Sequence, residues 1–199
     1  MRDTLKITSI ALRVMLVTLL GAGILYPLAM TGVCELLFPG KAHGSLLRDS
    51  QGRAVGSVLI GQRFASPAYF SSRPSAAGEL GYDAASSSGS NLGPTSKKLR
   101  ERAQEQLARL RSSDAPGAVP AELVTTSASG LDPHLSPAAV RWQVPRVAQA
   151  RGVRPERVLS VVQDHIEGRE LGILGEPRVN ILLLNLALDQ QFGRPGPAS

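Results

Sequence analysis

Cysteine and aromatic residues are scarce in this chain of 199 residues: Cys34 is its single cysteine, and Phe, Trp and Tyr make up 4%. One cysteine excludes an internal disulfide framework, so a folded domain must depend on a packed apolar core. The net charge is +6, but the basic residues are scattered and few rings are available to stack on bases. We therefore expect no nucleic-acid partner. Outside the cytoplasm, a basic surface would instead meet anionic lipid or an acidic partner.

Charged side chains are absent from one long stretch, Val14–Cys34. The hydrocarbon core of a bilayer is about 30 Å thick and needs about 20 apolar helical residues, so this stretch is long enough for one span. We predict a short cytoplasmic N-terminus at residues 1–13 and a transmembrane helix at 14–37. One alternative is a cleaved signal peptide, although no small-residue cleavage site is present. Another is a lipid anchor on Cys34, although the preceding Val33 is bulky.

Three basic residues, Arg2, Lys6 and Arg13, precede the apolar stretch. Lys and Arg are in excess on cytoplasmic flanks, so this pattern predicts a cytoplasmic N-terminus. Everything after the span would then lie outside the cytoplasm. The expected location is the plasma (inner) membrane, crossed once, with the main domain periplasmic or extracellular.

Small residues on the apolar stretch predict a surface for another helix. Thr18, Gly21 and Gly32 fall on nearly one face at 100° per residue. Small side chains allow helix backbones to approach closely in a membrane. Gly21 and Gly32 are therefore candidate partner-binding residues, and simple exposure to lipid is the alternative.

Residues 38–190 are long enough for one domain outside the cytoplasm, and the Pro- and Gly-rich residues 191–199 predict a disordered tail. We expect an α/β (α+β) fold with few short strands and about four helices. One strand is predicted at Ser57–Ile60, where glycines bracket an apolar run, with a hairpin partner in Arg48–Val55. A second is predicted at Glu122–Thr126.

Apolar periodicity and capping residues predict the helices of this domain. The clearest start is Ser136 followed by Pro137, a cap with proline at the first helical position. The polar stretch Ser66–Pro94 is predicted to be a long loop, and 112–120 a linker. The predicted helices cover residues 95–111, 137–151 with a bend at Pro145, 155–167, and 179–190 as a buried helix.

Sequence motifs for catalysis are few. His134 beside Asp132, and His165 beside Glu167, lack the spacing of metal ligands. The sequence contains neither a phosphate-binding loop nor the G-x-S-x-G motif of serine hydrolases. We therefore expect no metal site and no cofactor of its own. A serine near Gly130 with His134 as its base is the remaining catalytic hypothesis.

Five motifs follow the apolar stretch in a fixed order. They are GSVLIGQRF at 56–64, YF at 69–70 with RPSA at 73–76, SSGSNLGP at 87–94, the segment 127–137, and LGILGEPRVN at 171–180. With these motifs the chain resembles the C subunit of the Kdp potassium-transporting P-type ATPase, from the apolar stretch to Asp189. Trp142 and the proline-containing tail depart from the usual pattern, and neither affects a core motif.

The resemblance implies an accessory subunit of a four-part pump. Its partners would be a channel-like potassium-conducting subunit, a P-type ATP-hydrolysing subunit and a small single-span subunit. ATP, Mg²⁺ and potassium would be bound by those subunits. The family is also described as a catalytic chaperone that raises ATP affinity, with Ser88, Gly89, Ser90 and Asn91 likened to a nucleotide-binding signature. A domain outside the membrane cannot touch cytoplasmic ATP, so either this effect is allosteric, through the helices, or the orientation inferred from Arg2, Lys6 and Arg13 is wrong.

Polar residues in the loops are further candidates for partner binding, since loops on a rigid scaffold often carry binding groups. They are Gln62, Arg73, Asn91, Asp132 and His134. Asp132 either concentrates potassium through a local negative field or caps the turn before Pro133. Two other functions remain open: a membrane-tethered extracytoplasmic serine hydrolase, and a stand-alone binding or sensor domain.

Overall fold

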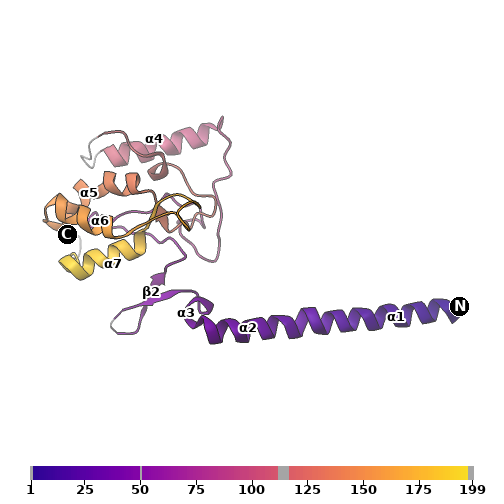
Figure 1. The fold of residues 1–199 in the computed structure, drawn as a ribbon. Helices are drawn as coiled ribbons and strands as arrows, with labels where there is room; N and C mark the ends of the chain where they lie inside the picture. Colours follow the sequence, from indigo (N-terminus) through magenta and orange to yellow (C-terminus); the bar gives the residue numbers. More distant parts are fainter. Residues whose placement is uncertain (1, 50, 112–116, 197–199) are drawn as a thin grey trace. The chain divides into compact units, whose positions relative to one another are not determined.

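The computed structural model describes residues 2–49, 51–111 and 117–196 (Figure 1). The chain divides into two compact units, Met1–Leu46 and Leu47–Ser199. We call the second unit the main domain.

The first unit is dominated by one helix, Arg2–Leu37, long and apolar enough to cross a membrane by length and composition. It consists of α1 (Arg2–Thr18), a π-helical segment η1 (Leu19–Leu25) and α2 (Tyr26–Leu37). None of its side chains is buried within the chain. The helix begins at Arg2, so the residues predicted as a separate N-terminal segment continue the same helix. At 1.5 Å per residue its 36 residues exceed a hydrocarbon core of about 30 Å.

The π-helical segment changes the spacing of the small residues. The Tyr26 N–H donates to the Gly21 carbonyl, five residues earlier, as a π-helix requires. The predicted common face of Gly21 and Gly32 assumed α-helical geometry throughout, and the wider π turn alters the angle between them. Both glycines have open space where a Cβ would lie.

A short helix, α3 (Pro39–Ala42), follows α2. Next, β1 (Leu46–Arg48) and β2 (Ala54–Ser57) form a two-stranded sheet. The strand predicted at Ser57–Ile60 is therefore wrong apart from its first residue. The chain turns after Ser57 because the Ile60 N–H donates to the Ser57 carbonyl and the Leu59 N–H donates to the Ser57 hydroxyl.

The described part of the main domain contains four longer helices, as predicted. The side chain of Ser136 accepts a hydrogen bond from the Ala139 N–H and caps one of them. Asn180 caps another by accepting from the Leu183 N–H. The helices are α4 (Lys97–Arg111), α5 (Pro137–Arg151), α6 (Pro155–Asp164) and α7 (Ile181–Phe192).

A three-stranded antiparallel sheet was not expected from the sequence. It has the order β3-β5-β4, formed by β3 (His134–Leu135), β5 (Arg178–Asn180) and β4 (Ile166–Glu167). His134 pairs with Asn180, and Ile166 pairs with Val179. The predicted helix 155–167 therefore ends at Asp164, and the last helix begins at Ile181. It continues to Phe192, into the predicted tail.

The strand predicted at Glu122–Thr126 is wrong. This segment contains a 3₁₀ helix, η2 (Ala121–Leu123). The Leu123 N–H donates to the Pro120 carbonyl, and the Glu122 carboxylate accepts from the Ser136 N–H. The polar side chain thus binds the neighbouring loop. The linker predicted at 112–120 lies mostly outside the described residues.

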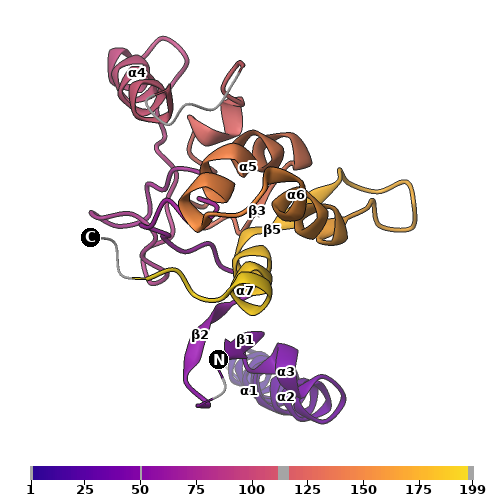
Figure 2. The same cartoon turned by 90° about the vertical axis from the view of Figure 1, so that its left-hand side faces the viewer.

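The core lies among α5, α6, α7 and the small sheet, with α5 packed on α6 (Figure 2). Its members include Val140, Val158, Val179 and Ile181. The long loop 66–94 has no described helix or strand, yet its Phe70 is fully buried in this core. Asn185 of α7 holds both backbone groups of Phe70, accepting from its N–H and donating to its carbonyl at 2.9 Å each. The loop is therefore fixed to the helices.

Candidate functional site: an interaction face built from loops

Four of the sequence motifs, residues 56–64, 69–76, 87–94 and 127–137, consist mostly of loop, although they include the end of β2 and the short strand β3. We call them the motif loops. Hydrogen bonds between backbone atoms bring three of them together, and the side chain of Arg73 joins the fourth, 69–76. The Gly61 N–H donates to the Leu131 carbonyl at 2.8 Å, and the Ser88 N–H donates to the Ser129 carbonyl at 3.0 Å. The segment 127–137 therefore lies at the centre of the face.

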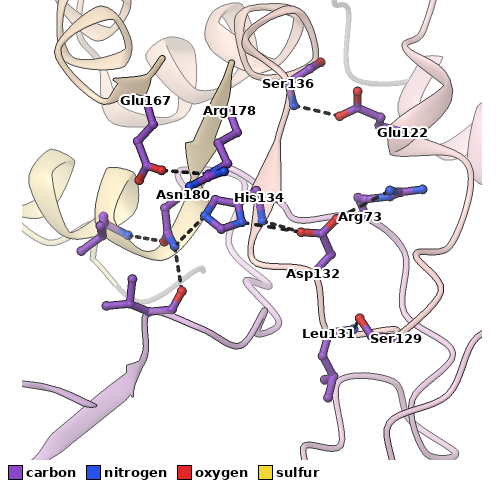
Figure 3. A network of polar contacts seen from close by, with 12 residues as sticks. Arg73, Glu122, Ser129, Leu131, Asp132, His134, Ser136, Glu167, Arg178 and Asn180 are labelled. Carbon is purple, nitrogen blue, oxygen red and sulfur yellow. Dashed lines mark hydrogen bonds and ion pairs between the residues drawn. The ribbon is translucent and has the colours of Figure 1, made fainter. Parts of the chain in front are cut away.

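Asp132 and Arg73 join two motif loops (Figure 3). Asp132 Oδ1 accepts from the His134 N–H at 3.0 Å, and Oδ2 lies 3.6 Å from Arg73 Nη1. Arg73 Nη2 also donates to the Thr126 carbonyl at 3.2 Å. Arg73 Nε is buried and makes no hydrogen bond within the described residues. The carboxylate of Asp132 thus closes its own turn and is partly neutralised by a guanidinium group.

His134 lies on β3 beside this pair, with its ring half-buried. Its Nε2 lies 3.5 Å from Asn180 Nδ2 and its Nδ1 lies 3.8 Å from Asp132 Oδ1. An amide nitrogen only donates, so Nε2 accepts and the proton of the neutral ring lies on Nδ1. Burial lowers the pKa of His134, while Glu167 and Asp132 act in the opposite direction. The ring is therefore neutral at pH 7.

Asn180 links the sheet to the loop after β2. Its Nδ2 donates to the Val58 carbonyl at 2.8 Å, while its Oδ1 caps α7 (Figure 3). The side chain is buried. The sequence predicted a buried helix over 179–190 but not this link, because Val58 lies 122 residues away along the chain.

Ser88 and Gly89 pack against the central segment, backbone to backbone. A Cβ on Gly89 would lie 2.7 Å from the Ala128 carbonyl oxygen, closer than any side chain allows. Gly130 has φ +69° and equally little room beside Ser88. Asn91 is exposed, with φ +50°. The small residues of this motif therefore serve close packing of two loops.

Gln62 does not lie with Arg73, Asp132 and His134. It lines a hollow of about 440 Å³, together with Phe64, Tyr69 and Leu182. The structure thus brings Arg73, Asp132 and His134 together, places Ser88 and Gly89 against the same central segment, and separates Gln62 from them.

Ser129 and Ser87 bond to the backbone, whereas the buried Ser127 hydroxyl makes no hydrogen bond within the described residues. The Ser129 hydroxyl accepts from the Leu131 N–H at 3.1 Å, and the Ser87 hydroxyl donates to the Ser129 carbonyl at 3.0 Å. These contacts do not favour a serine nucleophile with His134 as its base. Within the described residues, no group of three or more His, Cys, Asp or Glu side chains could hold a metal ion.

An ion pair that sequence reasoning missed fixes the loop at Tyr69 to two helices. Arg151 Nη2 of α5 and Asp189 Oδ1 of α7 lie 2.8 Å apart and are largely buried. The Tyr69 hydroxyl donates to Asp189 Oδ2 at 2.8 Å, and the Arg151 guanidinium lies 5.0 Å from the Tyr69 ring centre. Burial and the Asp189 bond raise the pKa of Tyr69. No local pattern indicates this contact, because its members are far apart in sequence.

The fold and the face define a class of protein: a chain with one helix of membrane-spanning length and an α+β domain whose motif loops bind one another through their own polar groups. Comparison with known proteins identifies the family. The model of the family KdpC, described as "K+-transporting ATPase, c chain", matches residues 8–190.

Similar proteins carry the same description. A potassium-transporting ATPase KdpC subunit of Myxococcus xanthus is 66% identical over 185 residues, covering 92% of this chain and 87% of the relative. One of Caulobacter vibrioides is 53% identical over 170 residues (85% and 86%). One of Geobacter sulfurreducens is 49% identical over 178 residues (89% and 94%).

The chain therefore belongs to the KdpC family of K⁺-transporting ATPase subunits. This confirms the resemblance carried by the five motifs. As a family member, the chain is a subunit that works with other Kdp subunits in potassium transport.

Proposed function

We propose that the chain is an accessory, non-catalytic subunit of a high-affinity, ATP-driven potassium uptake complex. It stabilises the assembly and covers the outer mouth of the channel-like, potassium-conducting subunit. Its other partners are the P-type ATP-hydrolysing subunit and a small single-span subunit. ATP, Mg²⁺ and potassium are bound by these other subunits, and the chain needs no cofactor of its own.

The observation that carries this proposal is how the motif loops use their polar groups. Asp132 closes a turn and pairs with Arg73, and Asn180 binds the Val58 carbonyl. Ser129 binds the Leu131 N–H. A catalytic centre needs a nucleophile or base directed at a substrate. Here the polar side chains instead hold the loops in shape. A surface of fixed shape is suited to binding a partner protein.

The helix Arg2–Leu37 supports an anchoring role. One helix cannot enclose an ion pathway, and all of its side chains are exposed and so available to partner helices. Arg2, Lys6 and Arg13 favour a cytoplasmic N-terminus and a periplasmic main domain. In that orientation the domain acts on ATP affinity as a catalytic chaperone only by allosteric coupling through the membrane helices.

A reporter fused to the C-terminus of the full chain tests this orientation. Alkaline phosphatase is active only outside the cytoplasm, and a fluorescent protein that folds only inside serves as the reciprocal fusion. We expect an active phosphatase and a dark fluorescent fusion in cells that also contain the other subunits. The reverse result would place the domain in the cytoplasm and would contradict the outer-mouth role.

A further inference from the structure

The hairpin formed by β4 and β5, residues 166–180, exposes large apolar side chains at its tip. Leu171 is 89% exposed, Ile173 75% and Leu174 56%. The connection between the two strands extends away from α6 and the sheet (Figure 2). These side chains are not among the residues of the main domain's core.

The hairpin has a defined shape of its own. The N–H groups of Glu170 and Leu174 each donate to the other's carbonyl at 2.9 Å. Arg169 Nη2 donates to both carboxylate oxygens of Glu176, at 2.8 and 2.9 Å. Arg178 donates to Glu167 and Glu170, at 3.0 and 3.2 Å. The apolar tip is thus carried on a cross-linked stem.

The tip is unfavourable for the isolated domain in two ways. Leu171 has φ +53°, in the left-handed region that a glycine or asparagine adopts more easily. It also leaves its whole side chain in water, where burial would stabilise it. A residue that costs stability by its backbone conformation and by its exposure is commonly kept for a contact.

We propose that the tip of this hairpin is a docking element that inserts Leu171 and Ile173 into an apolar recess on another subunit of the same transporter. This inference rests on the proposed assembly role of the chain and names the surface that carries it. The partner is expected to present an apolar recess with a polar rim, as protein interfaces commonly do.

The charges around the tip favour a protein partner over a lipid surface. Insertion into an anionic bilayer needs unpaired basic residues beside the apolar ones. Here both guanidinium groups are engaged by carboxylates, and three carboxylates against two guanidinium groups give a net charge of −1. The charged groups are Glu167, Arg169, Glu170, Glu176 and Arg178.

Exchange of the tip for polar residues tests the proposal in the full chain. Leu171→Asn with Ile173→Gln removes the apolar surface, and asparagine suits the left-handed conformation at 171. The matched control is Leu80→Asn, because Leu80 is 86% exposed in another loop. We expect the double variant to enter the membrane and to melt no lower than wild type. Its recovery of the other Kdp subunits, identified by mass spectrometry, should fall about tenfold or more, while the control recovers them normally.

Normal recovery with the double variant would overturn the hairpin as a docking element and leave the proposed function standing. Failure of the wild-type chain to recover the other subunits would contradict both proposals.

A photocrosslinker at the tip distinguishes a subunit from a lipid. A benzophenone-bearing phenylalanine is incorporated at position 173 or at position 80 of the full chain during synthesis, in cells that also contain the other subunits, and the assembled complex is irradiated. We expect an adduct with another transporter subunit from position 173 and none from position 80. A probe at 173 that reacts only with lipid, or gives no protein adduct, overturns the proposal.

Discussion

Single residues in the motif loops act mainly through the turns they hold. Asp132 accepts the His134 N–H and lies 3.6 Å from Arg73 Nη1, so its charge is already partly compensated. The two roles predicted for Asp132, a negative field for potassium and a turn cap, are therefore unequal. The geometry favours the cap.

Asp132→Asn and Asp132→Ala separate these roles. Asparagine keeps an oxygen for the turn, so we expect it to lower the free energy of unfolding by at most about 1 kcal/mol, the range of an exposed ion pair. Alanine also loses the hydrogen bond and should lower it by about 1 kcal/mol more. Potassium-stimulated ATP turnover of the complex should keep its potassium dependence in Asp132→Asn. A weaker apparent potassium affinity, strongest at low ionic strength, would restore the field hypothesis.

Gly89 is needed for the contact between two loops. A Cβ at this position would lie 2.7 Å from the Ala128 carbonyl oxygen, whereas a Cβ on Gly93 in the same loop meets nothing within 4 Å. We expect Gly89→Ala to lower the free energy of unfolding by about 1–3 kcal/mol and Gly93→Ala to change it little. Chemical denaturation of both variants measures this. A stable Gly89→Ala chain with a changed ATP affinity of the complex would instead favour a direct nucleotide role.

His134 gives the main domain a pH dependence of known sign. Burial lowers its folded-state pKa below 6.5, so the unfolded chain binds the proton more readily. The contribution of His134 to the free energy of unfolding is therefore complete above pH 6.5, and it is lost as the pH falls through the lowered pKa. We expect His134→Gln to flatten part of the fall in unfolding free energy below pH 6.5. An equally steep fall in the variant, or an NMR titration of His134 above 6.5, would contradict this.

Among the elements, helices could be predicted and strands could not. Ser136 and Pro137 mark the start of α5 through contacts within one turn, which a sequence shows directly. By contrast, β3 and β5 have two and three residues, too few for a recognisable alternation. They pair over a long separation in sequence, 46 residues for His134 and Asn180. A still longer separation, 122 residues, hid Asn180 as the link between β5 and the Val58 loop.

The membrane helix is expected to pack against a partner helix at its glycines. Gly21 and Gly32 have open space at the helix surface, and leucine would add bulk where backbones approach. We expect Gly21→Leu and Gly32→Leu to reduce recovery of the complex severalfold while insertion persists. Gly23→Leu is the control within the same π segment, since residues two positions apart do not face the same side of a helix. A Cβ at this position would lie 3.3 Å from the flexible end of the Leu19 side chain. Full recovery of the complex from both variants would mean that these glycines face lipid.

At the scale of the whole molecule, long-range contacts turn a loop-rich sequence into a rigid domain. The Arg151–Asp189 pair with Tyr69, and Asn185 with Phe70, fix the loop 66–94 to α5 and α7. The five motifs identified the family because their order along the chain is visible. They did not reveal which loops meet, because that depends on these distant pairs.

The central claim is that the chain assists a potassium-transporting ATPase without catalysing the reaction itself. The most direct test measures ATP turnover by residues 41–199, which contain the main domain, by the full chain alone, and by the complex purified through a tag on the full chain. For the first two samples we predict ATP turnover no higher than that of a blank preparation. The tagged full chain should recover its multi-span partners, and this complex should show ATP turnover that potassium stimulates. ATP turnover by the purified main domain, or a full chain recovered from membranes without any partner, would contradict the account.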